Sequence, residues 1–315
     1  MLSKSDLRLW KDAAKSLFYG IASKERTAPS FMGWTDTLAT GTQTRSESAI
    51  PRIVWMYWDG DTKPPLVEAT IARVRALNPD HDVRLLDNRS VREHIEAPFL
   101  ERSDLAAALK SDLIRLELLA QYGGIWVDAT CIFHESLQWV HDASCSDSAD
   151  LVAYYRAQDT QDRRFPIIES WFLACPPQTT LVQVWRDELR KVLTLGRDAY
   201  FRSLVARPDY DTIRQGIERP EYLLVYLAEQ IALREAEASA LFLRKAEDGP
   251  FLYQMAVRWD RERIATLLCR LDAPVTPPPV IKLTHSNRYL LPLLIRLRLV
   301  RGSSVLGRFL ESLAR

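Results

Sequence analysis

Residues 110–130 of the chain read KSDLIRLELLAQYGGIWVDAT, and this stretch predicts a helix, a tight turn and a strand. Leucines recur at spacings of three and four, the period of a helix that buries one face: Leu105, Leu109, Leu113, Leu116 and Leu119. Gly123 and Gly124 predict the end of the helix, because glycine adopts the left-handed backbone that closes one. Residues 125–127, Ile-Trp-Val, are an apolar run of the kind found in a buried strand.

Three of the five charged side chains in this stretch form a pattern. Asp112 and Arg115 are three residues apart on the predicted helix and so lie on one face of it. Asp128 follows the predicted strand, and in open α/β sheets ligands bind at that end of the strands. Carboxylates accept from hydroxyls and a guanidinium donates in a fork to phosphate or hydroxyl oxygen, so the pattern favours a ligand with sugar hydroxyls and phosphates. The alternative is a surface ion pair followed by a turn.

The string Ser111–Arg115, followed by Tyr122–Thr130, resembles the core of the capsular-polysaccharide-synthesis glycosyltransferases. These are relatives of the yeast-type initiating mannosyltransferases and the clostridial glucosylating toxins. The resemblance implies an α/β fold, a GT-A-like (Rossmann-like) single domain with a mixed, mostly parallel sheet. It also implies that Asp112 and Arg115 clamp the donor sugar and that Asp128 is the first Asp of an Asp-x-Asp motif, which makes these three the predicted catalytic residues.

The resemblance implies a divalent cofactor as well, Mn²⁺ or Mg²⁺, held by Asp128 and His285. Thr130 stands where the second Asp of the motif is expected, and a hydroxyl is a weaker ligand for a hard cation than a carboxylate. Residues 280–287, VIKLTHSN, predict a last strand that ends in polar groups. The resemblance implies that Lys282 and Asn287 contact the donor and that one of them helps to neutralise the leaving diphosphate, the more so if the metal binds weakly.

Aromatic side chains cluster in residues 50–60, which predict a buried first strand. Trp55 or Trp58 matches the aromatic that stacks on the nucleobase in the resembled family, although packing in the core is the alternative for both. The same resemblance adds Trp126 and Ser170 to the predicted donor-binding residues. Glu169, beside Ser170 in a predicted strand, is a weaker candidate, with an exposed carboxylate at a strand edge as its alternative.

Composition places the chain among ordinary globular proteins. It has 315 residues, 47% of them hydrophobic and 26% charged, and a net charge of +1 that gives no global case for nucleic acid binding. Its four cysteines have no paired short spacing, so they predict neither a zinc site nor disulfides and fit a reducing cytoplasm. The chain starts unlike a signal peptide, and it has no uninterrupted apolar segment of membrane-spanning length.

Three segments are predicted: an N-terminal helix and linker (1–48), a GT-A-like domain (49–287) and a basic amphipathic helical tail (288–315). Residues 3–22 predict a helix that packs on the domain or lies in a membrane interface, and 23–48 read as a linker or loosely ordered loop. The leucine-rich, arginine-rich tail predicts either a cap on the domain or contact with an anionic bilayer, at the inner face of the bacterial membrane.

Further elements follow from periodicity and turn residues. The order strand, helix, strand, helix over residues 50–95 predicts the opening of a parallel sheet. Strands are predicted at 151–155 and 169–175, and helices at 179–195 and 221–238. Residues 200–216, polar and aromatic, predict either a surface loop or a variable region on the acceptor side.

Together these features predict a glycosyltransferase that moves a sugar from a nucleoside diphosphate sugar to a hydroxyl of a growing capsular or surface polysaccharide. The resemblance implies retention of the anomeric configuration and a glycan or lipid-linked glycan as acceptor. Two alternatives stay open: a non-catalytic sugar-nucleotide or glycan-binding subunit of a polysaccharide assembly complex, and a host-directed glycosylating effector on the same fold.

Overall fold

The computed structural model describes residues 3–40, 49–60, 62–146, 149–236 and 239–311. A seven-stranded sheet is its centre, in the spatial order β1-β8-β6-β7-β4-β2-β3. Its strands are β1 (Thr37–Thr40), β2 (Ile53–Tyr57), β3 (Asp82–Leu86), β4 (Gly124–Val127), β6 (Leu151–Tyr155), β7 (Ile168–Cys175) and β8 (Leu241–Lys245). The pairings β2–β3, β2–β4 and β6–β8 are parallel and the other three antiparallel, so the sheet is mixed, as predicted.

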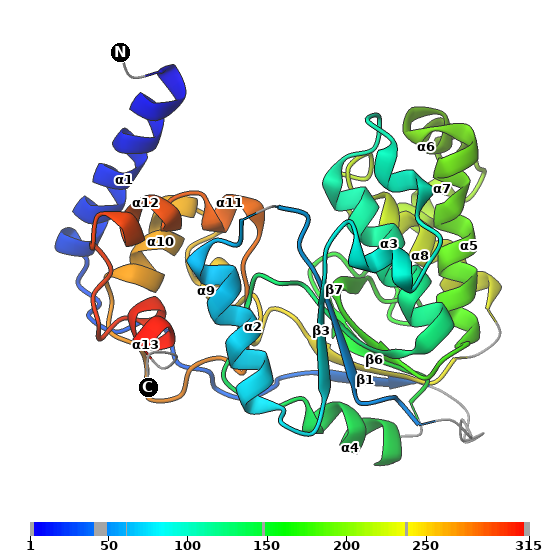
Figure 1. The fold of residues 1–315 in the computed structure, drawn as a ribbon, viewed down its shortest axis with the longest axis horizontal. Helices are drawn as coiled ribbons and strands as arrows, with labels where there is room; N and C mark the ends of the chain where they lie inside the picture. Colours follow the sequence, from blue (N-terminus) through cyan, green and yellow to red (C-terminus); the bar gives the residue numbers. More distant parts are fainter. Residues whose placement is uncertain (1–2, 41–48, 61, 147–148, 237–238, 312–315) are drawn as a thin grey trace.

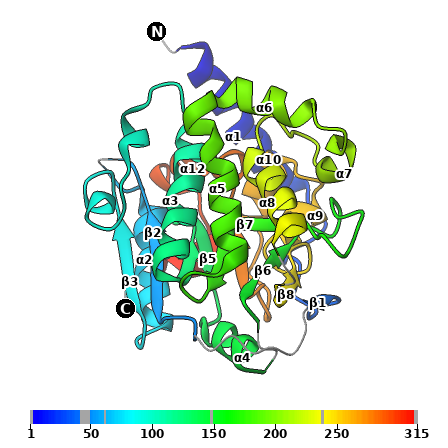
Figure 2. The ribbon, with the colours of Figure 1, turned by 90° about the vertical axis from the view of Figure 1, so that its right-hand side faces the viewer.

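Helices cover both faces of this sheet, because side chains alternate along its strands. Val54 and Met56 point to a core shared with α2 (Pro65–Leu77) and α4 (Gln138–Ser146). Trp55 and Trp126 point to the opposite core. That core is shared with α3 (Ala107–Tyr122), α5 (Thr180–Leu195) and α8 (Leu224–Glu235), which Figure 2 shows in front of the sheet. The predicted α/β class is therefore confirmed.

The two ends of the chain meet in a third core beside the sheet (Figure 1). This helical group contains α1 (Lys4–Ala22), α9 (Leu252–Ala256), α10 (Arg261–Cys269), α11 (His285–Arg288), α12 (Leu291–Arg296) and α13 (Val305–Glu311). A separate two-stranded sheet, β5 (Cys131–Phe133) with β9 (Val280–Lys282), joins it to the central domain. Short 3-10 helices, η1 (Ser90–Glu93) and η2 (Pro98–Glu101), lie between β3 and α3.

Two loop predictions are wrong. Within the predicted linker 23–48, β1 forms an edge strand of the main sheet, so the domain boundary at residue 48 falls after the first strand. Residues 41–48 lie outside the described residues. For residues 200–216 the surface-loop alternative is wrong, because the segment contains most of α6 (Arg197–Val205) and α7 (Tyr210–Arg214), with Tyr200 and Ile213 buried against the core. The alternative of an acceptor-side region stays a prediction.

The tail predicted as one amphipathic helix is divided among α11, α12 and α13. Its apolar side chains face inward: Leu291, Leu294, Leu306 and Phe309 are all buried. The tail therefore caps the domain and presents no continuous apolar face to a bilayer, while residues 312–315 lie outside the described part. Within the described residues, no helix has both the length and the apolar character needed to cross a membrane. The cysteines are free, as predicted.

Candidate functional site

The turn between α3 and β4 is set by its two glycines. Gly123 and Gly124 have φ values of +62° and +95°, which L side chains rarely adopt. A Cβ on Gly124 would lie 2.7 Å from the carbonyl oxygen of Ile53, so backbone crowding adds a second requirement for glycine. The Trp55 indole N–H donates to the Gly123 carbonyl at 2.9 Å, and this hydrogen bond stabilises the turn. This tight reversal brings the end of β4 back beside α3.

Arg115 is the centre of the charged cluster that results. Its guanidinium lies 2.7 Å from the Asp112 carboxylate and 3.1 Å from the Asp128 carboxylate, and it donates to the Ser170 hydroxyl at 2.5 Å. The guanidinium also lies 5.2 Å from the centre of the Trp126 ring. Only 5% of the Arg115 side chain is exposed, which makes these partners necessary for a buried cation. The structure thus brings the three predicted catalytic residues together.

Asp128 and Asp112 differ in their electrostatic surroundings. The Lys282 ammonium lies 2.5 Å from Asp128 Oδ2, and the Trp126 indole N–H donates to Oδ1 at 3.0 Å. Burial by itself raises the pKa of Asp128, but the Lys282 ammonium and the Arg115 guanidinium outweigh it and lower the pKa to about 2. Burial raises the pKa of Asp112 to about 6, although the Arg115 guanidinium opposes this shift.

These groups line a cavity of about 390 Å³. Part of its wall is formed by Trp58, by His285 and by Arg288, whose guanidinium lies 5.9 Å from the centre of the Trp58 ring. Burial lowers the pKa of Arg288, and its Nε has no hydrogen-bond partner among the described residues. A cation and an aromatic face thus lie together beside the charged cluster.

A second group of lining residues surrounds Arg156. Its guanidinium lies 5.5 and 5.4 Å from the ring centres of Phe251 and Trp259, and its Nε is 3.6 Å from Glu169 Oε1. The other Glu169 oxygen accepts from the Tyr226 hydroxyl at 2.7 Å. Oε1 itself has no hydrogen-bond partner among the described residues, although Glu169 is 1% exposed. A buried acceptor without a donor is suited to a ligand hydroxyl.

The backbone before α10 supports this second group of residues. Arg258 and Trp259 have φ values of +51° and +61°, and such values are uncommon outside glycine. This strained turn directs Trp259 into the cavity lining.

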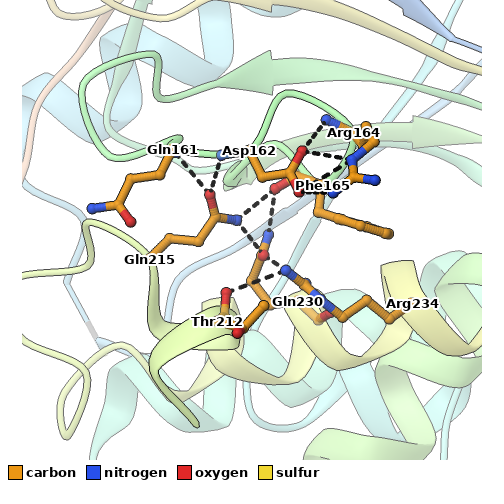
Figure 3. Close-up of polar contacts among 8 residues, drawn as sticks. All are labelled: Gln161, Asp162, Arg164, Phe165, Thr212, Gln215, Gln230 and Arg234. Atoms are coloured by element: carbon orange, nitrogen blue, oxygen red, sulfur yellow. Dashed lines mark hydrogen bonds and ion pairs between the residues drawn. The ribbon is translucent and has the colours of Figure 1, made fainter. Parts of the chain in front are cut away.

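The loop that leads into Glu169 and Ser170 is fixed by a polar network from α8 and the residue after α7 (Figure 3). The Gln215 amide oxygen accepts from the backbone N–H groups of Gln161 and Asp162 at 2.8 and 2.9 Å. Gln230 donates to the Phe165 carbonyl at 3.1 Å, and the Arg234 guanidinium lies 4.2 Å from the centre of the Phe165 ring. The first residues of β7 are thereby held at the cavity.

Three predicted donor-binding residues do not line the cavity. Trp55 is fully buried beneath the glycine turn, so of the two candidate platforms only Trp58 can meet a base. Trp126 is buried and acts on the site from behind, through its contacts with Asp128 and Arg115. Asn287 is buried and accepts from the Thr284 N–H and the Gln254 amide, because it caps α11. The remaining predicted residues line the cavity: Trp58, Asp112, Arg115, Asp128, Ser170, Lys282 and His285.

Arg156, Trp259 and Arg288 also line the cavity, although the sequence motifs did not single them out as site residues. Arg156 directly follows β6 and Arg288 lies three residues after His285, so the strand-end rule and helical spacing were usable signals. No such signal existed for Trp259, because the direction of its side chain depends on a positive φ that no local sequence pattern predicts.

The predicted metal ligands do not form a divalent-ion site in this arrangement. The Lys282 ammonium occupies one Asp128 oxygen, while Arg115 and Trp126 donate to the other. The Thr130 hydroxyl donates to the Leu283 carbonyl at 3.1 Å and is buried. The described residues contain no group of three or more His, Cys, Asp or Glu side chains placed to hold a metal ion. A divalent ion at Asp128 and His285 therefore stays a prediction from sequence, one that requires Lys282 to move.

Comparison with known proteins bears on the family. A model of the family described as capsular polysaccharide synthesis protein matches residues 35–194, about half of the chain. An O-glycosyltransferase of Annulohypoxylon truncatum, braB, is 34% identical over 110 residues, which are 30% of this chain and 26% of that protein. The glycosyltransferase afumC of Aspergillus fumigatus is 26% identical over 207 residues, 58% of this chain and 51% of that protein.

The chain thus spans about a quarter and about half of the length of these two relatives. A solved structure, the PaToxG glycosyltransferase, aligns with 74% of this chain and 91% of its own at 13% identity and a TM-score of 0.35.

Proposed function

The chain belongs to the capsular polysaccharide synthesis protein family, and from this premise we propose that it is a glycosyltransferase. The proposed reaction moves a sugar from a nucleoside diphosphate sugar to a hydroxyl of a growing capsular or surface glycan. The observation that supports it best is the joining of Asp112, Arg115, Asp128 and Lys282 in one cavity lined by aromatic rings. The family resemblance read from the sequence is confirmed by the family match.

In this proposal Asp112 and Arg115 hold the donor sugar. The Asp112 carboxylate accepts from sugar hydroxyls, and Arg115, 2.7 Å away, favours its ionised form and fixes its direction. Since Arg115 is held by four neighbouring side chains, the clamp needs little rearrangement when the sugar binds. Fixing a reactant in this way lowers the entropic part of the barrier.

The leaving diphosphate is assigned to Lys282 and Arg288. Both are cationic and both line the cavity, one beside Asp128 and the other over the Trp58 ring. Trp58 is the proposed platform for the nucleobase, because any of the nucleobases can stack on an aromatic ring. His285, exposed at the start of α11, is a further contact for the diphosphate.

Positive charge placed on the diphosphate is the main source of catalysis in this scheme. The bond between the anomeric carbon and the phosphate oxygen breaks as an acceptor hydroxyl oxygen bonds to the same carbon. The hydroxyl proton passes to the departing phosphate oxygen, so no protein base is required. Attack from the face of the leaving group retains the anomeric configuration, which nuclear magnetic resonance of the product tests through its anomeric coupling constant.

Acceptor binding is assigned to the residues around Arg156. Glu169 Oε1 is buried, lies 3.6 Å from Arg156 Nε and has no hydrogen-bond partner among the described residues. Trp259 offers a ring face to the apolar side of a sugar. Trp259→Ala is expected to raise the KM for the acceptor while donor hydrolysis stays normal. Equal losses in both reactions would place Trp259 in the donor site instead.

Metal dependence separates the two ways of neutralising the diphosphate. With Lys282 at Asp128, turnover is expected to persist in EDTA. Complete loss in EDTA with recovery in Mn²⁺ would instead support the predicted ion. Calorimetric donor titrations of wild-type protein and Asp128→Asn, each with and without Mn²⁺, give the second readout. Equal affinities throughout would remove Asp128 from the donor site.

Donor hydrolysis without acceptor tests the enzymatic proposal directly. Each nucleoside diphosphate sugar of a panel is first screened by thermal shift, and sugar release from those that bind is then followed over time. Transferases commonly leak sugar to water, whereas the alternative, a non-catalytic sugar-nucleotide or glycan-binding subunit, would bind a donor and release none. Asp198→Asn, a carboxylate with 74% of its side chain exposed, is the matched control for Asp128→Asn.

A further inference from the structure

Helix α1 has a second apolar stripe that faces solvent. Leu7 is 57% exposed, Trp10 42%, Phe18 64% and Ile21 75%. Together with Ala14, also exposed, these residues follow spacings of three, four, four and three, so they lie along one side of the helix. Single exposed apolar residues are ordinary on protein surfaces, but a continuous helical stripe marks an interaction surface.

The opposite side of α1 is fixed to α10, so the helix cannot rotate about its axis to bury the stripe. The Ser16 and Thr266 hydroxyls lie 3.2 Å apart, and the Thr266 hydroxyl also donates to the Ser16 carbonyl at 2.9 Å. Arg261 pairs with Asp12 at 2.5 Å. The N-terminal half of α1 projects beyond the neighbouring helices in both views (Figures 1 and 2). The stripe is thus held outward by the packed side of its own helix.

Basic side chains run beside the apolar stripe. Arg8, Lys11 and Lys15 follow spacings of three and four, and the side chains of Arg8 and Lys15 are 71% and 45% exposed. Residues 3–24 contain five basic and two acidic residues, a net charge of +3 (5 − 2). The two acidic groups are engaged, Asp6 by Ser3 in the helix cap and Asp12 by Arg261. Arg8 also lies 4.0 Å from Asp12, and Lys15 pairs with Glu262 at 3.2 Å, so part of the positive charge beside the stripe is neutralised. The net charge of residues 3–24 remains positive.

A groove of about 560 Å³ continues the apolar surface from Phe18 to the packed side of α1. Apolar side chains from three segments line it, among them Val257 and Leu267. Arg263 and Glu25 also lie on its wall, and the Arg263 guanidinium is 5.0 Å from the centre of the Tyr19 ring. An apolar hollow with an exposed cation beside it matches an acyl chain below a phosphate group.

We propose that α1 docks on the surface of an anionic phospholipid bilayer. The stripe of Leu7, Trp10, Phe18 and Ile21 enters the boundary between head groups and acyl chains, and the basic side chains bind lipid phosphates. A second copy of the chain is a poorer occupant of this surface. A symmetric contact between two α1 helices would bring their basic side chains together, and these would repel each other. The proposal does not depend on glycosyl transfer.

The sequence left membrane contact open as an alternative for both ends of the chain, and this assignment favours the N-terminal helix over the tail. The tail has basic residues, but most of its apolar side chains are buried or partly buried in the domain, and Leu297 is the exception at 36% exposed among its described residues. On α1 the two features occur together on accessible surface. Membrane association and the tail's composition are therefore separable by mutation.

Flotation with lipid vesicles tests the proposal. Wild-type protein is expected to float with vesicles of phosphatidylcholine mixed with phosphatidylglycerol and to stay behind with phosphatidylcholine alone. Phe18→Ser/Ile21→Ser is expected to lower the partition coefficient at least ~10-fold, because two apolar side chains no longer enter the bilayer. Arg8→Glu/Lys11→Glu is expected to abolish the preference for anionic lipid. High salt should weaken wild-type binding.

Leu195→Ser/Val205→Ser is the matched control, since these apolar residues are 49% and 46% exposed but lie on α5 and α6. It should float like wild type. Thermal melting checks that all variants are folded. Wild-type protein that floats with neither vesicle, or stripe variants that float normally, would overturn the proposal. So would a dimer, seen by analytical ultracentrifugation, that the stripe substitutions dissociate while vesicle binding is absent.

Discussion

Helices α3 and α1 both depart from the usual distribution of side chains: α3 buries charged residues, and α1 exposes apolar ones. In α3 the charged residues Arg115 and Glu117 are only 4% and 7% exposed, whereas in α1 the apolar residues Phe18 and Ile21 are 64% and 75% exposed. Burying a charge is costly without a partner, and exposing an apolar stripe is costly unless something covers it. The buried charges of α3 therefore point to a ligand site, and the exposed apolar residues of α1 point to a docking surface.

The two buried charges of α3 also differ from each other. Glu117 is paired with Arg190 at 2.6 Å and does not line the cavity, so it is a structural ion pair. Arg115 is paired with two carboxylates that both line the cavity. Burial of a charge is thus informative about function only together with the space that its partners face.

The largest effect is expected at the centre of the α3 cluster. Arg115→Ala should lower donor turnover ~1,000-fold, because the sugar clamp and part of the charge balance are lost together. It should also lower the free energy of unfolding by about 3 kcal/mol, because two buried carboxylates lose their cation. Steady-state kinetics and urea denaturation measure the two effects.

The control for this change is Arg164→Ala, whose side chain is 82% exposed in a surface ion pair. It should leave both turnover and the denaturation midpoint unchanged. Normal turnover and normal stability in Arg115→Ala would show that the buried pairs of α3 have no special role, and the contrast with α1 would disappear.

The next effect concerns the turn that places the cluster. Gly124→Ala should lower the free energy of unfolding by about 3 kcal/mol, because its Cβ would meet the Ile53 carbonyl at 2.7 Å. Gly196 also has a positive φ, +80°, but nothing lies within 4 Å of an added Cβ. Gly196→Ala should therefore cost less, about 1 to 2 kcal/mol, from its backbone conformation alone (φ +80°, ψ 153°). Equal losses would mean that conformation alone, and not crowding, requires glycine at residue 124.

A smaller effect is expected in the pH dependence of activity. The pKa of Asp112 is about 6, so kcat/KM should rise as pH increases through about 6, when the carboxylate becomes able to accept from sugar hydroxyls. Asp112→Asn should lack this rise at its lower activity. A wild-type profile that is flat across this range would argue against Asp112 as the clamp.

The same carboxyl affects stability in the opposite sense. Its pKa is raised by folding from 3.8 to about 6, so the protonated form is favoured in the folded protein. Its contribution is fully present below pH 3.8 and is lost as pH rises through 6. Wild type should therefore lose stability relative to Asp112→Asn as pH rises across this range in urea denaturation, because the neutral amide mimics the protonated carboxyl and cannot ionise.

The smallest effect is expected on α1. Phe18→Ser should change the free energy of unfolding by no more than about 0.5 kcal/mol, because a mostly exposed ring contributes little to folding. Leu113→Ala, at a fully buried position of α3, should cost about 3 kcal/mol. A large loss in Phe18→Ser would show that Phe18 serves the fold, and its availability for docking would then be in question.

Local sequence patterns were sufficient where the determining contacts are local. The leucine spacing, the double glycine and the apolar strand predicted α3, its end and β4, and the spacing of Asp112, Arg115 and Asp128 indicated one pocket. Periodicity failed in residues 200–216, where buried anchors such as Tyr200 make helices out of a polar segment. It also did not distinguish Trp55 from Trp58, since the side of a strand that meets a ligand depends on what packs against it.

The sequence by itself determined the helix-glycine-strand unit, the family and the charged side chains at the strand end, because these follow from spacing and backbone preference over a few residues. Tertiary structure alone decided that Lys282, 154 residues from Asp128, takes the place beside it where a metal ion was expected. It also decided that the tail is buried while α1 exposes its apolar stripe. Pairing and burial depend on which distant segments meet, and no local periodicity encodes that choice.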